Sequence, residues 1–353
     1  MIKYLGSKRR LVPVLCALAE RARARTALDL FTGTTRVAQV FKLAGARVTA
    51  VDTSRYSAVL AACYVATDAA TIDRRALEAA LARLNSLPGR PGYVTDTFCV
   101  RSRFFQPHNG ARIDAVRDVI QSDYEGSALE PLLLTSLMEA ADRVDSTTGV
   151  QMAYVKQWAP RSFGLLELRA PSLVPGAGTA VLGDACALAR ELGQFDLAYL
   201  DPPYNQHRYA ANYHIWETLV AWDAPEHYGV ACKRADLRST PRSPFNSKRT
   251  MVDALAGVIR DVSARVMVLS YNDESWVSLD RLVELCSERG HVEVLAFPSN
   301  RYVGARIGIH NPAGERVGSV GRLRNVEYVL VAGDRREVRH LVEPWRDGSA
   351  ATR

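Results

Sequence analysis

Short apolar runs alternate with amphipathic stretches at the start of the chain. The run TALDLF (26–31) predicts a strand, and RVAQVFKLAG (36–45) predicts a helix that ends at Gly45. RVTAVD (47–52) and SRYSAVLAACYVAT (54–67) repeat this order of strand and helix. Because consecutive strands joined by helices pair side by side, the pattern predicts a parallel sheet.

The same alternation resumes in the second half of the chain, near residue 179. Its segments are TAVLGDACALARELGQFDLAYLDPPY (179–204), RVMVLSYND (265–273), SWVSLDRLVELCSERG (275–290), HVEVLAF (291–297) and VEYVLVAG (326–333). Both halves therefore contribute strands to one α/β domain.

The segment between the two halves has a different pattern. Helical stretches at RRALEAALARLNSL (74–87) and ALEPLLLTSLMEAADRV (128–144) flank residues 88–113, which have no clean period and are rich in Arg and aromatic residues. We predict a doubly wound, mostly parallel catalytic domain formed by residues 1–66 and 176–345. Residues 67–175 form an inserted, mainly helical domain, and 346–353 a flexible tail.

Composition places the chain among ordinary globular proteins. Of 353 residues, 48% are hydrophobic and 24% charged, and the formal net charge is +7. The six cysteines are scattered without a CxxC pair, which favours reduced thiols over a disulfide framework or a metal site. We find no signal-like start and no apolar run of about 18 residues, so we expect a cytoplasmic protein with no metal and no membrane contact.

The stretch DLAYLDPPYN (196–205) is the strongest chemical signal. Pro202 and Pro203 cannot donate to a sheet ladder, so they end the strand after Leu200. Asp201 and Tyr204 then lie at the carboxyl end of a strand, where open α/β sheets bind their ligands.

These residues suit methyl transfer to an exocyclic amine of a nucleobase. Such an amine is a poor nucleophile because its lone pair is delocalised into the ring. Asp201 and the backbone carbonyl of Pro202 can both accept hydrogen bonds from it, which frees the lone pair for in-line attack. Pro203 keeps the turn rigid, and Tyr204 can stack on the base and favour the developing positive charge.

Three other strand ends are candidates for a nucleotide-like ligand. DLFTGTTR (29–36) is a strand, turn and helix start in which Gly33 permits positive φ. Asp52 ends the next strand about 20 residues later, where such sites place an acid on ribose hydroxyls, although Ser54 beside it suggests a helix cap. Asp184 could hydrogen-bond an adenine amine or cap the helix that follows it.

Taken together, these motifs resemble the DPPY-type DNA adenine methyltransferases, the DNA adenine methylase class. The resemblance covers most of the chain: an amino-terminal Lys-bearing segment KYLGSKRRLVPVL (3–15), the first sheet motif, a target-recognition insertion, then DPPY. It implies a Rossmann-like S-adenosylmethionine-dependent fold with an antiparallel edge strand. The cofactor-binding positions that it implies, with the strand-end acids above, are Tyr4, Gly6, Lys8, Asp29, Phe31, Gly33, Asp52 and Asp184.

Two further details belong to this resemblance. SYND (270–273) matches a later strand-end motif that shapes the base pocket. Thr35 departs from the family, which usually has a second glycine-like residue there, and this affects the fine geometry of the cofactor site. The family acts on double-stranded DNA by flipping the target base, and this chain is expected to be monomeric, with a cognate restriction endonuclease or as an orphan methylase.

Basic residues supply the candidate DNA contacts. VRSRFFQPHNGAR (100–112) interleaves charged and aromatic side chains, and the region after DPPY is also basic. The alternative for the first stretch is a solvated loop over a buried Phe pair. The candidate DNA-binding residues are Arg101, Arg103, His108, Asn109, Arg208 and Lys248.

Two other functions compete with adenine methylation. The same amine chemistry serves the N4 amine of cytosine or a base in RNA. However, cytosine enzymes more often carry Ser where Asp201 stands, and RNA enzymes of this fold are commonly smaller. A DNA-binding module with a decayed cofactor site is the alternative outside enzymes, and Thr35 is the feature that favours it.

Overall fold

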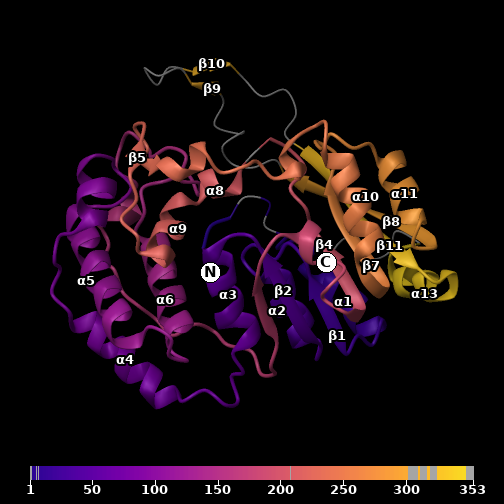
Figure 1. Ribbon diagram of the computed structural model, residues 1–353, viewed down its shortest axis with the longest axis horizontal. Helices are drawn as coiled ribbons and strands as arrows, with labels where there is room; N and C mark the ends of the chain where they lie inside the picture. The colour runs from indigo at the N-terminus through magenta and orange to yellow at the C-terminus, as the bar shows by residue number, and fades with distance from the viewer. Residues whose placement is uncertain are drawn as a thin grey trace.

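A seven-stranded sheet forms the centre of the protein (Figure 1). The computed structural model describes residues 2–4, 6, 8–206, 208–300, 309–310, 316–318 and 324–346. The strand order is β3-β2-β1-β4-β7-β11-β8. The strands are β1 Thr26–Asp29, β2 Arg47–Asp52, β3 Thr179–Leu182, β4 Gln194–Leu200, β7 Ser263–Asn272, β8 His291–Asn300 and β11 Arg324–Gly333.

The prediction of a mostly parallel, doubly wound sheet is confirmed. Strands β3, β2, β1, β4 and β7 pair in parallel. Strand β11 runs antiparallel to both β7 and β8, so the antiparallel strand lies one place in from the edge. Because β1, β2 and β4 point the same way, Asp29, Asp52 and Asp201 meet at one edge of the sheet.

Helices cover both faces of this sheet. One face packs against α1, α2 and α13, and the other against α7, α10 and α11, each through its own apolar cluster. Their bounds are α1 Val12–Arg21, α2 Arg36–Leu43, α7 Ala185–Leu188, α10 Met251–Asp261, α11 Leu279–Ser287 and α13 Arg335–Arg346. Helix α2 ends as predicted, with Gly45 at φ +89° and its N–H donating to the Lys42 carbonyl at 3.0 Å.

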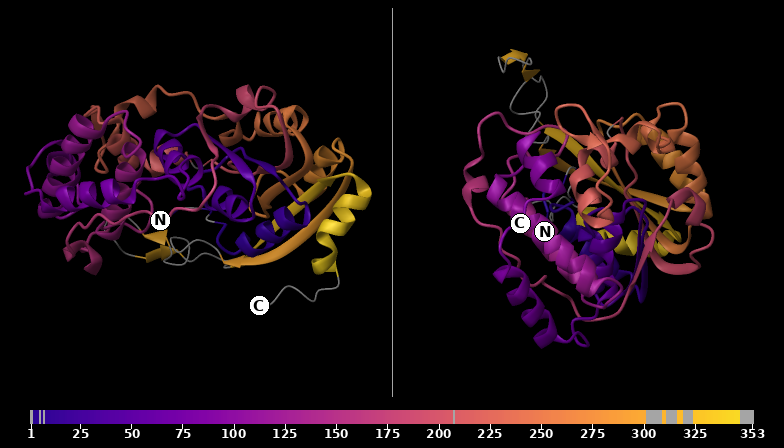
Figure 2. Two further views of the ribbon diagram at one scale, coloured as in Figure 1. Left: turned by 90° about the horizontal axis from the view of Figure 1, so that it is seen from below. Right: turned by 60° about the vertical axis from the view of Figure 1, so that its left-hand side comes forward.

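A helical lobe lies beside the sheet (Figure 2). It contains α4 Arg74–Ser86, α5 Pro107–Tyr124, α6 Glu130–Arg143 and α9 His214–Ala221. A third apolar cluster joins these helices to α3, Arg55–Ala61, which lies between the lobe and the sheet. The lobe therefore combines the proposed insertion with a segment that follows DPPY.

Helix α5 begins inside the stretch for which the sequence indicates no regular element. Its polar residues Asn109, Asp114 and Arg117 are buried, so it shows no amphipathic period. Phe104 and Phe105, just before α5, are in the core of the lobe, which confirms the buried Phe pair for that stretch.

The remaining elements are short. They are π-helical turns Ala62–Ala66 and Thr95–Val100, helix α8 Tyr209–Asn212, 3-10 turns Pro160–Phe163, Ala235–Arg238 and Pro244–Asn246, the pair β5 His227–Tyr228 with β6 Lys233–Arg234, and the pair β9 Ile309–His310 with β10 Arg316–Gly318. Arg346 ends α13, and 347–353 of the predicted tail lie outside the described residues. No helix within the described part of the chain is long and apolar enough to span a membrane.

Candidate active site

A cavity of about 570 Å³ opens at the carboxyl ends of β1, β2 and β4. Both the first sheet motif and DPPY contribute to its wall. Of the sequence-predicted residues, the lining includes Tyr4, Gly6, Phe31, Asp52, Asp184, Asp201, Pro203 and Arg208. The turn that carries Gly33 lies beside this cavity, because its backbone N–H donates to Asp52 Oδ2 at 2.9 Å.

Asp201 lies at the end of β4 in a buried ion pair with Lys8. Lys8 Nζ is 3.1 Å from Asp201 Oδ1 and 3.2 Å from Glu327 Oε2. Burial raises the pKa of Asp201 to about 6, an effect that Lys8 opposes and Glu327 adds to. Burial alone would lower the pKa of Lys8, but the carboxylates of Asp201 and Glu327 raise it well above its usual value.

The rest of DPPY forms one wall beside this ion pair. Pro202 is buried, and Pro203 faces the cavity. Lys8 Nζ lies 5.9 Å from the centroid of the Tyr204 ring, which packs against Tyr271 of the SYND motif. The ring centroids of Tyr271 and Tyr204 are 5.8 Å apart, so the SYND motif contacts DPPY directly. That SYND shapes a base pocket stays a prediction.

Asp29 and Asp52 hold the first βα turn. Asp29 Oδ2 accepts from Thr32 Oγ1 at 2.9 Å and from the Ala38 backbone N–H at 3.1 Å. Asp29 Oδ1 is buried without a partner among the described residues, and burial raises the pKa of this carboxyl to about 7. Asp52 accepts backbone N–H groups from Gly33 and Ser54, and burial raises its pKa.

Tyr4 fixes the position of the amino-terminal segment over this turn. Its ring stacks on Tyr213 and Tyr209, with centroid distances of 4.7 and 5.4 Å. Gly33 has φ +50°, and a Cβ there would lie 3.0 Å from Tyr4 Oη. Gly6, at φ +75°, approaches Tyr209, where a Cβ would lie 3.4 Å from the hydroxyl. The backbone conformation therefore favours glycine at both positions, and at Gly33 the close approach of Tyr4 also leaves little space for a side chain.

Thr35, where the resemblance predicts a glycine-like residue, has a backbone conformation that favours glycine. Its φ is +62°, in the left-handed region, and the residue is fully buried. Its Oγ1 accepts a hydrogen bond from Gln39 Nε2 at 2.9 Å. The turn keeps the glycine-type conformation, so the departure changes the side chain and not the course of the backbone.

Asp184 satisfies one of its two predicted roles. Its carboxylate accepts from the backbone N–H groups of Cys186 and Ala187, so it caps α7. It also lines the cavity, so a ligand contact stays a prediction. Phe31 lies edge to face with Phe245, with centroids 5.2 Å apart, and both rings contribute to the cavity wall.

The candidate DNA residues fall into two groups. Arg101, His108 and Lys248 are exposed, and Arg101 forms a surface ion pair with Asp96. Arg103 is half-buried: it donates to the Lys156 carbonyl and stacks on Trp158, with its guanidinium carbon 4.6 Å from the ring centroid.

The other two candidates have internal partners. Asn109 is fully buried, and its side-chain amide binds the backbone of Ser162, Gly164 and Leu166, so the prediction of a direct DNA contact does not fit its position. Arg208 lines the cavity and donates to the carbonyls of Leu237 and Thr240. It holds the segment 237–240 against the cavity.

Sequence reasoning missed several residues at this site. The sequence indicated only a basic region around Tyr209 and Phe245, and only a strand around Glu327. Arg234, counted with the basic region, is buried and bound by the carboxylates of Asp223 and Asp236. Burial opposes the charge of Arg234, but these two carboxylates raise its pKa.

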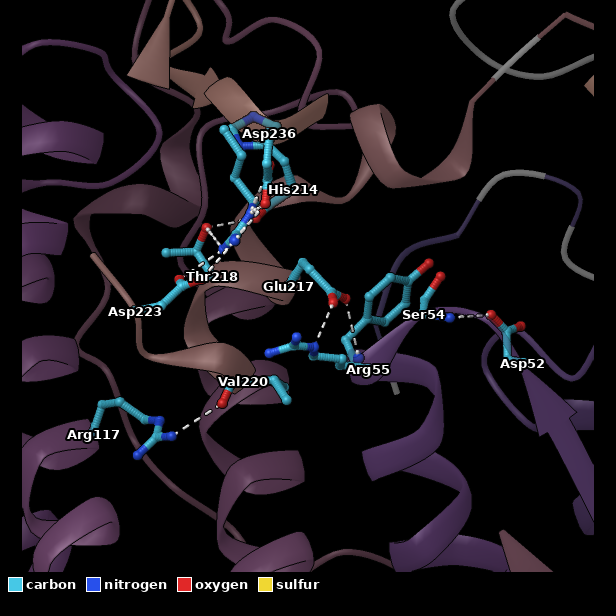
Figure 3. Close-up of polar contacts among 12 residues, drawn as sticks. Asp52, Ser54, Arg55, Arg117, His214, Glu217, Thr218, Val220, Asp223 and Asp236 are labelled. Carbon is cyan, nitrogen blue, oxygen red and sulfur yellow. Dashed lines mark hydrogen bonds and ion pairs between the residues drawn. The ribbon is translucent and has the colours of Figure 1, made fainter. Parts of the chain in front are cut away.

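Helix α9 connects the helical lobe to the cavity (Figure 3). Glu217 points from α9 toward the start of α3, where it accepts from the Tyr56 N–H at 3.4 Å and pairs with Arg55 at 3.7 Å. At the other end of α9, Arg117 donates to the carbonyls of Leu219 and Val220. These contacts attach the segment after DPPY, which forms part of the cavity wall, to α3 and to α5 of the lobe.

Comparisons with known proteins identify relatives of this chain. The chain is 30% identical over 317 residues to "Type II methyltransferase M.NlaIII" of Neisseria lactamica, which covers 85% of this chain and 92% of that protein. It is 27% identical over 322 residues to "Modification methylase StsI" of Streptococcus sanguinis, of which the match covers 49%. "Type II methyltransferase M.CviAII" of Paramecium bursaria Chlorella virus 1 is 32% identical over 217 residues, 60% of this chain and 64% of that protein.

A family model covers most of the chain. It describes the "D12 class N6 adenine-specific DNA methyltransferase" and matches residues 4–285, from the amino-terminal Lys-bearing segment to α11. The matched region contains Lys8, the first βα turn and DPPY. The chain therefore belongs to the D12 class of N6 adenine-specific DNA methyltransferases.

Proposed function

We propose that this protein transfers a methyl group from S-adenosylmethionine to N6 of adenine within a short recognition sequence of double-stranded DNA. The family supports the chemistry and the base. Two relatives are named a type II methyltransferase and a modification methylase, and on this ground we propose a role beside a cognate restriction endonuclease. We also propose that the protein works in the cytoplasm. We propose that a monomer carries out the reaction.

The observation that carries this proposal is the position of Asp201. Its carboxylate lies at the end of a buried strand, faces the cavity and uses Oδ1 for Lys8. We propose that Oδ2 accepts an N–H of the adenine amine. The Pro202 carbonyl, which belongs to a rigid turn, is our candidate for the second acceptor.

The residues around the first βα turn fit the methyl donor. The cofactor carries a ribose, an adenine and an ammonium group, and when bound it supplies an electrophilic methyl group on a sulfonium. Asp52 is our candidate for the ribose hydroxyls, because it ends β2 and faces the cavity. Phe31 and Phe245 would hold the adenine. Asp29 Oδ1, which is buried and has no partner in the described part of the chain, would accept from the ammonium group.

The reaction needs only hydrogen-bonding groups from the protein. Asp201 and Pro202 draw the amine toward tetrahedral geometry, so its lone pair can form the new N–C bond as the methyl–sulfur bond breaks. The nitrogen would lose one proton on methylation, and the Asp201 carboxylate is our candidate to accept it. Tyr204 stacks on the base and favours its transient positive charge.

The target adenine has to leave the duplex to reach this cavity. Flipping a paired base costs a few kcal/mol, which contacts to the phosphate backbone must offset. The formal charge of +7 and the exposed side chains of Arg101, His108 and Lys248 support such contacts. We propose that Arg103, which stacks on Trp158, also belongs to the DNA interface. We propose that Asn109 and Arg208, which bind backbone groups, support the segments around the site.

Incubating the purified protein with duplex DNA and tritiated S-adenosylmethionine tests this function. We expect N6-methyladenine after digestion to nucleosides, and sequencing that detects modified bases should show a single recognition sequence. Label in N4-methylcytosine, or label only on RNA, would support the amine-methyltransferase alternatives. Absence of cofactor binding by calorimetry at millimolar concentration would instead support a DNA-binding module with a decayed site.

A further inference from the structure

The ion pair of Asp201 and Lys8 has a third member, which comes from β11. This strand lies two places from β4 in the sheet. Glu327 lies on β11, and Asn272 of β7 donates from Nδ2 to Glu327 Oε1 at 2.7 Å. The other oxygen, Oε2, accepts from Lys8 Nζ at 3.2 Å. The Lys8 ammonium is therefore shared between Glu327 and Asp201, and Asn272 fixes the direction in which Glu327 points.

This arrangement has a consequence for the catalytic carboxylate. A lysine ammonium is a compact charge with three rotatable donors, so with Asp201 as its one carboxylate partner Lys8 could lie over either oxygen or between the two. Here the 3.1 Å contact takes Oδ1 of Asp201, while Glu327 takes a second donor of the same ammonium. With the ammonium held at Oδ1, Oδ2 of Asp201 is our candidate acceptor for the target amine.

We propose that Glu327 is a positioning residue for methyl transfer: it holds Lys8 away from the second oxygen of Asp201 and so keeps that oxygen for the target amine. This inference rests on the proposed role of Asp201. Glu327 itself touches neither the base nor the methyl donor in the proposed mechanism. It acts through Lys8, and Asn272 supports it.

The charged and titratable groups that face Asp201 come from every element around it. They are Lys8 of the amino-terminal segment, Glu327 of β11, Asp29 of β1, Tyr199 of β4, Tyr271 of β7, and Tyr204 and Tyr209 after β4. In this group Lys8 favours the ionised form of Asp201, whereas Glu327 and burial oppose it. Neutralising Glu327 therefore lowers the pKa of Asp201.

The Glu327→Gln variant separates this role from simple support of the fold. We expect kcat/KM to fall roughly 10- to 100-fold, since Lys8 would be free to move toward Oδ2 of Asp201 and displace the amine. The acid limb of the pH profile should at the same time move to lower pH. S-adenosylmethionine affinity by calorimetry should stay within about twofold, as for Glu288→Gln, a matched change of an exposed carboxylate on the same domain.

A double-mutant cycle with Lys8→Met completes the test. If Glu327 acts through Lys8, Glu327→Gln should change the single-turnover rate by less than about twofold in the Lys8→Met background. Equal losses in both backgrounds, or a Glu327→Gln enzyme with the wild-type rate and pH profile, would overturn the inference. Asp201→Ala in the same assay separates a failure of the inference about Glu327 from a failure of the proposed mechanism. An active Asp201→Ala enzyme contradicts the mechanism itself, whatever Glu327 does.

Discussion

Replacing Gly33 by Ala should weaken cofactor binding without unfolding the protein. The added Cβ would lie 3.0 Å from Tyr4 Oη and 3.1 and 3.2 Å from two ring carbons. Tyr4 cannot turn away freely, because its ring is stacked on Tyr213 and Tyr209. The residue also has φ +50°, which costs an L-amino acid about 1–2 kcal/mol.

The strain and the contact act together on the cofactor site. To relieve the backbone strain or the close contact, the turn or the Tyr4 ring has to move. The turn and the ring both lie at the wall of the cavity. A shift that costs about 1.4 kcal/mol of binding free energy raises the dissociation constant tenfold. We therefore expect the S-adenosylmethionine dissociation constant of Gly33→Ala to rise at least about tenfold, measured by isothermal titration calorimetry.

Gly45→Ala is the matched control for this experiment. Gly45 also has positive φ, +89°, but no atom of the described residues lies within 4 Å of the position of its Cβ. The control should lose a similar amount of stability and keep the wild-type cofactor affinity. Wild-type binding by Gly33→Ala, or equal weakening by both variants, would refute the reasoning.

Three further predictions concern the turn, the insertion and pH. Thr35 has φ +62°, so the Thr35→Gly variant should be about 1 kcal/mol more stable than the Thr35→Ala variant in urea unfolding. A Thr35→Ala variant of equal or higher stability would contradict backbone strain at this position. Asn109→Ala should lower the free energy of unfolding by about 1–3 kcal/mol and leave the salt dependence of DNA binding unchanged. Arg101→Ala should instead reduce the slope of the logarithm of the DNA-binding constant against the logarithm of the salt concentration by about one. Because the amine needs ionised Asp201, kcat/KM should fall as pH drops below about 6; a flat profile down to pH 5 would argue against this pKa.

The parts of the site that could be predicted from the sequence depend on local patterns. The end of β4 followed from two prolines after an apolar run, and the Gly33 turn from a strand and a helix with one glycine between them. Both involve neighbouring residues, so tertiary structure had little scope to change them. DPPY and Asp52 therefore lie at the predicted edge of the sheet.

The parts that could not be predicted depend on long-range contacts. Glu327 is 319 residues from Lys8 in sequence and occupies an ordinary polar position in an alternating strand. Asn109 and Arg234 look like surface residues because polar side chains usually are, yet each has enough internal hydrogen bonds to be buried. Local composition contains no signal for such partners.

The most direct test of the central claim compares Asp201→Ala with the matched surface variant Asp280→Ala. Each is incubated with duplex DNA and tritiated S-adenosylmethionine, and cofactor affinity is measured by calorimetry on the same preparation. We predict that Asp201→Ala binds the cofactor but leaves no label in N6-methyladenine, while Asp280→Ala methylates as the wild type does. Methylation by Asp201→Ala at the wild-type rate would contradict the account.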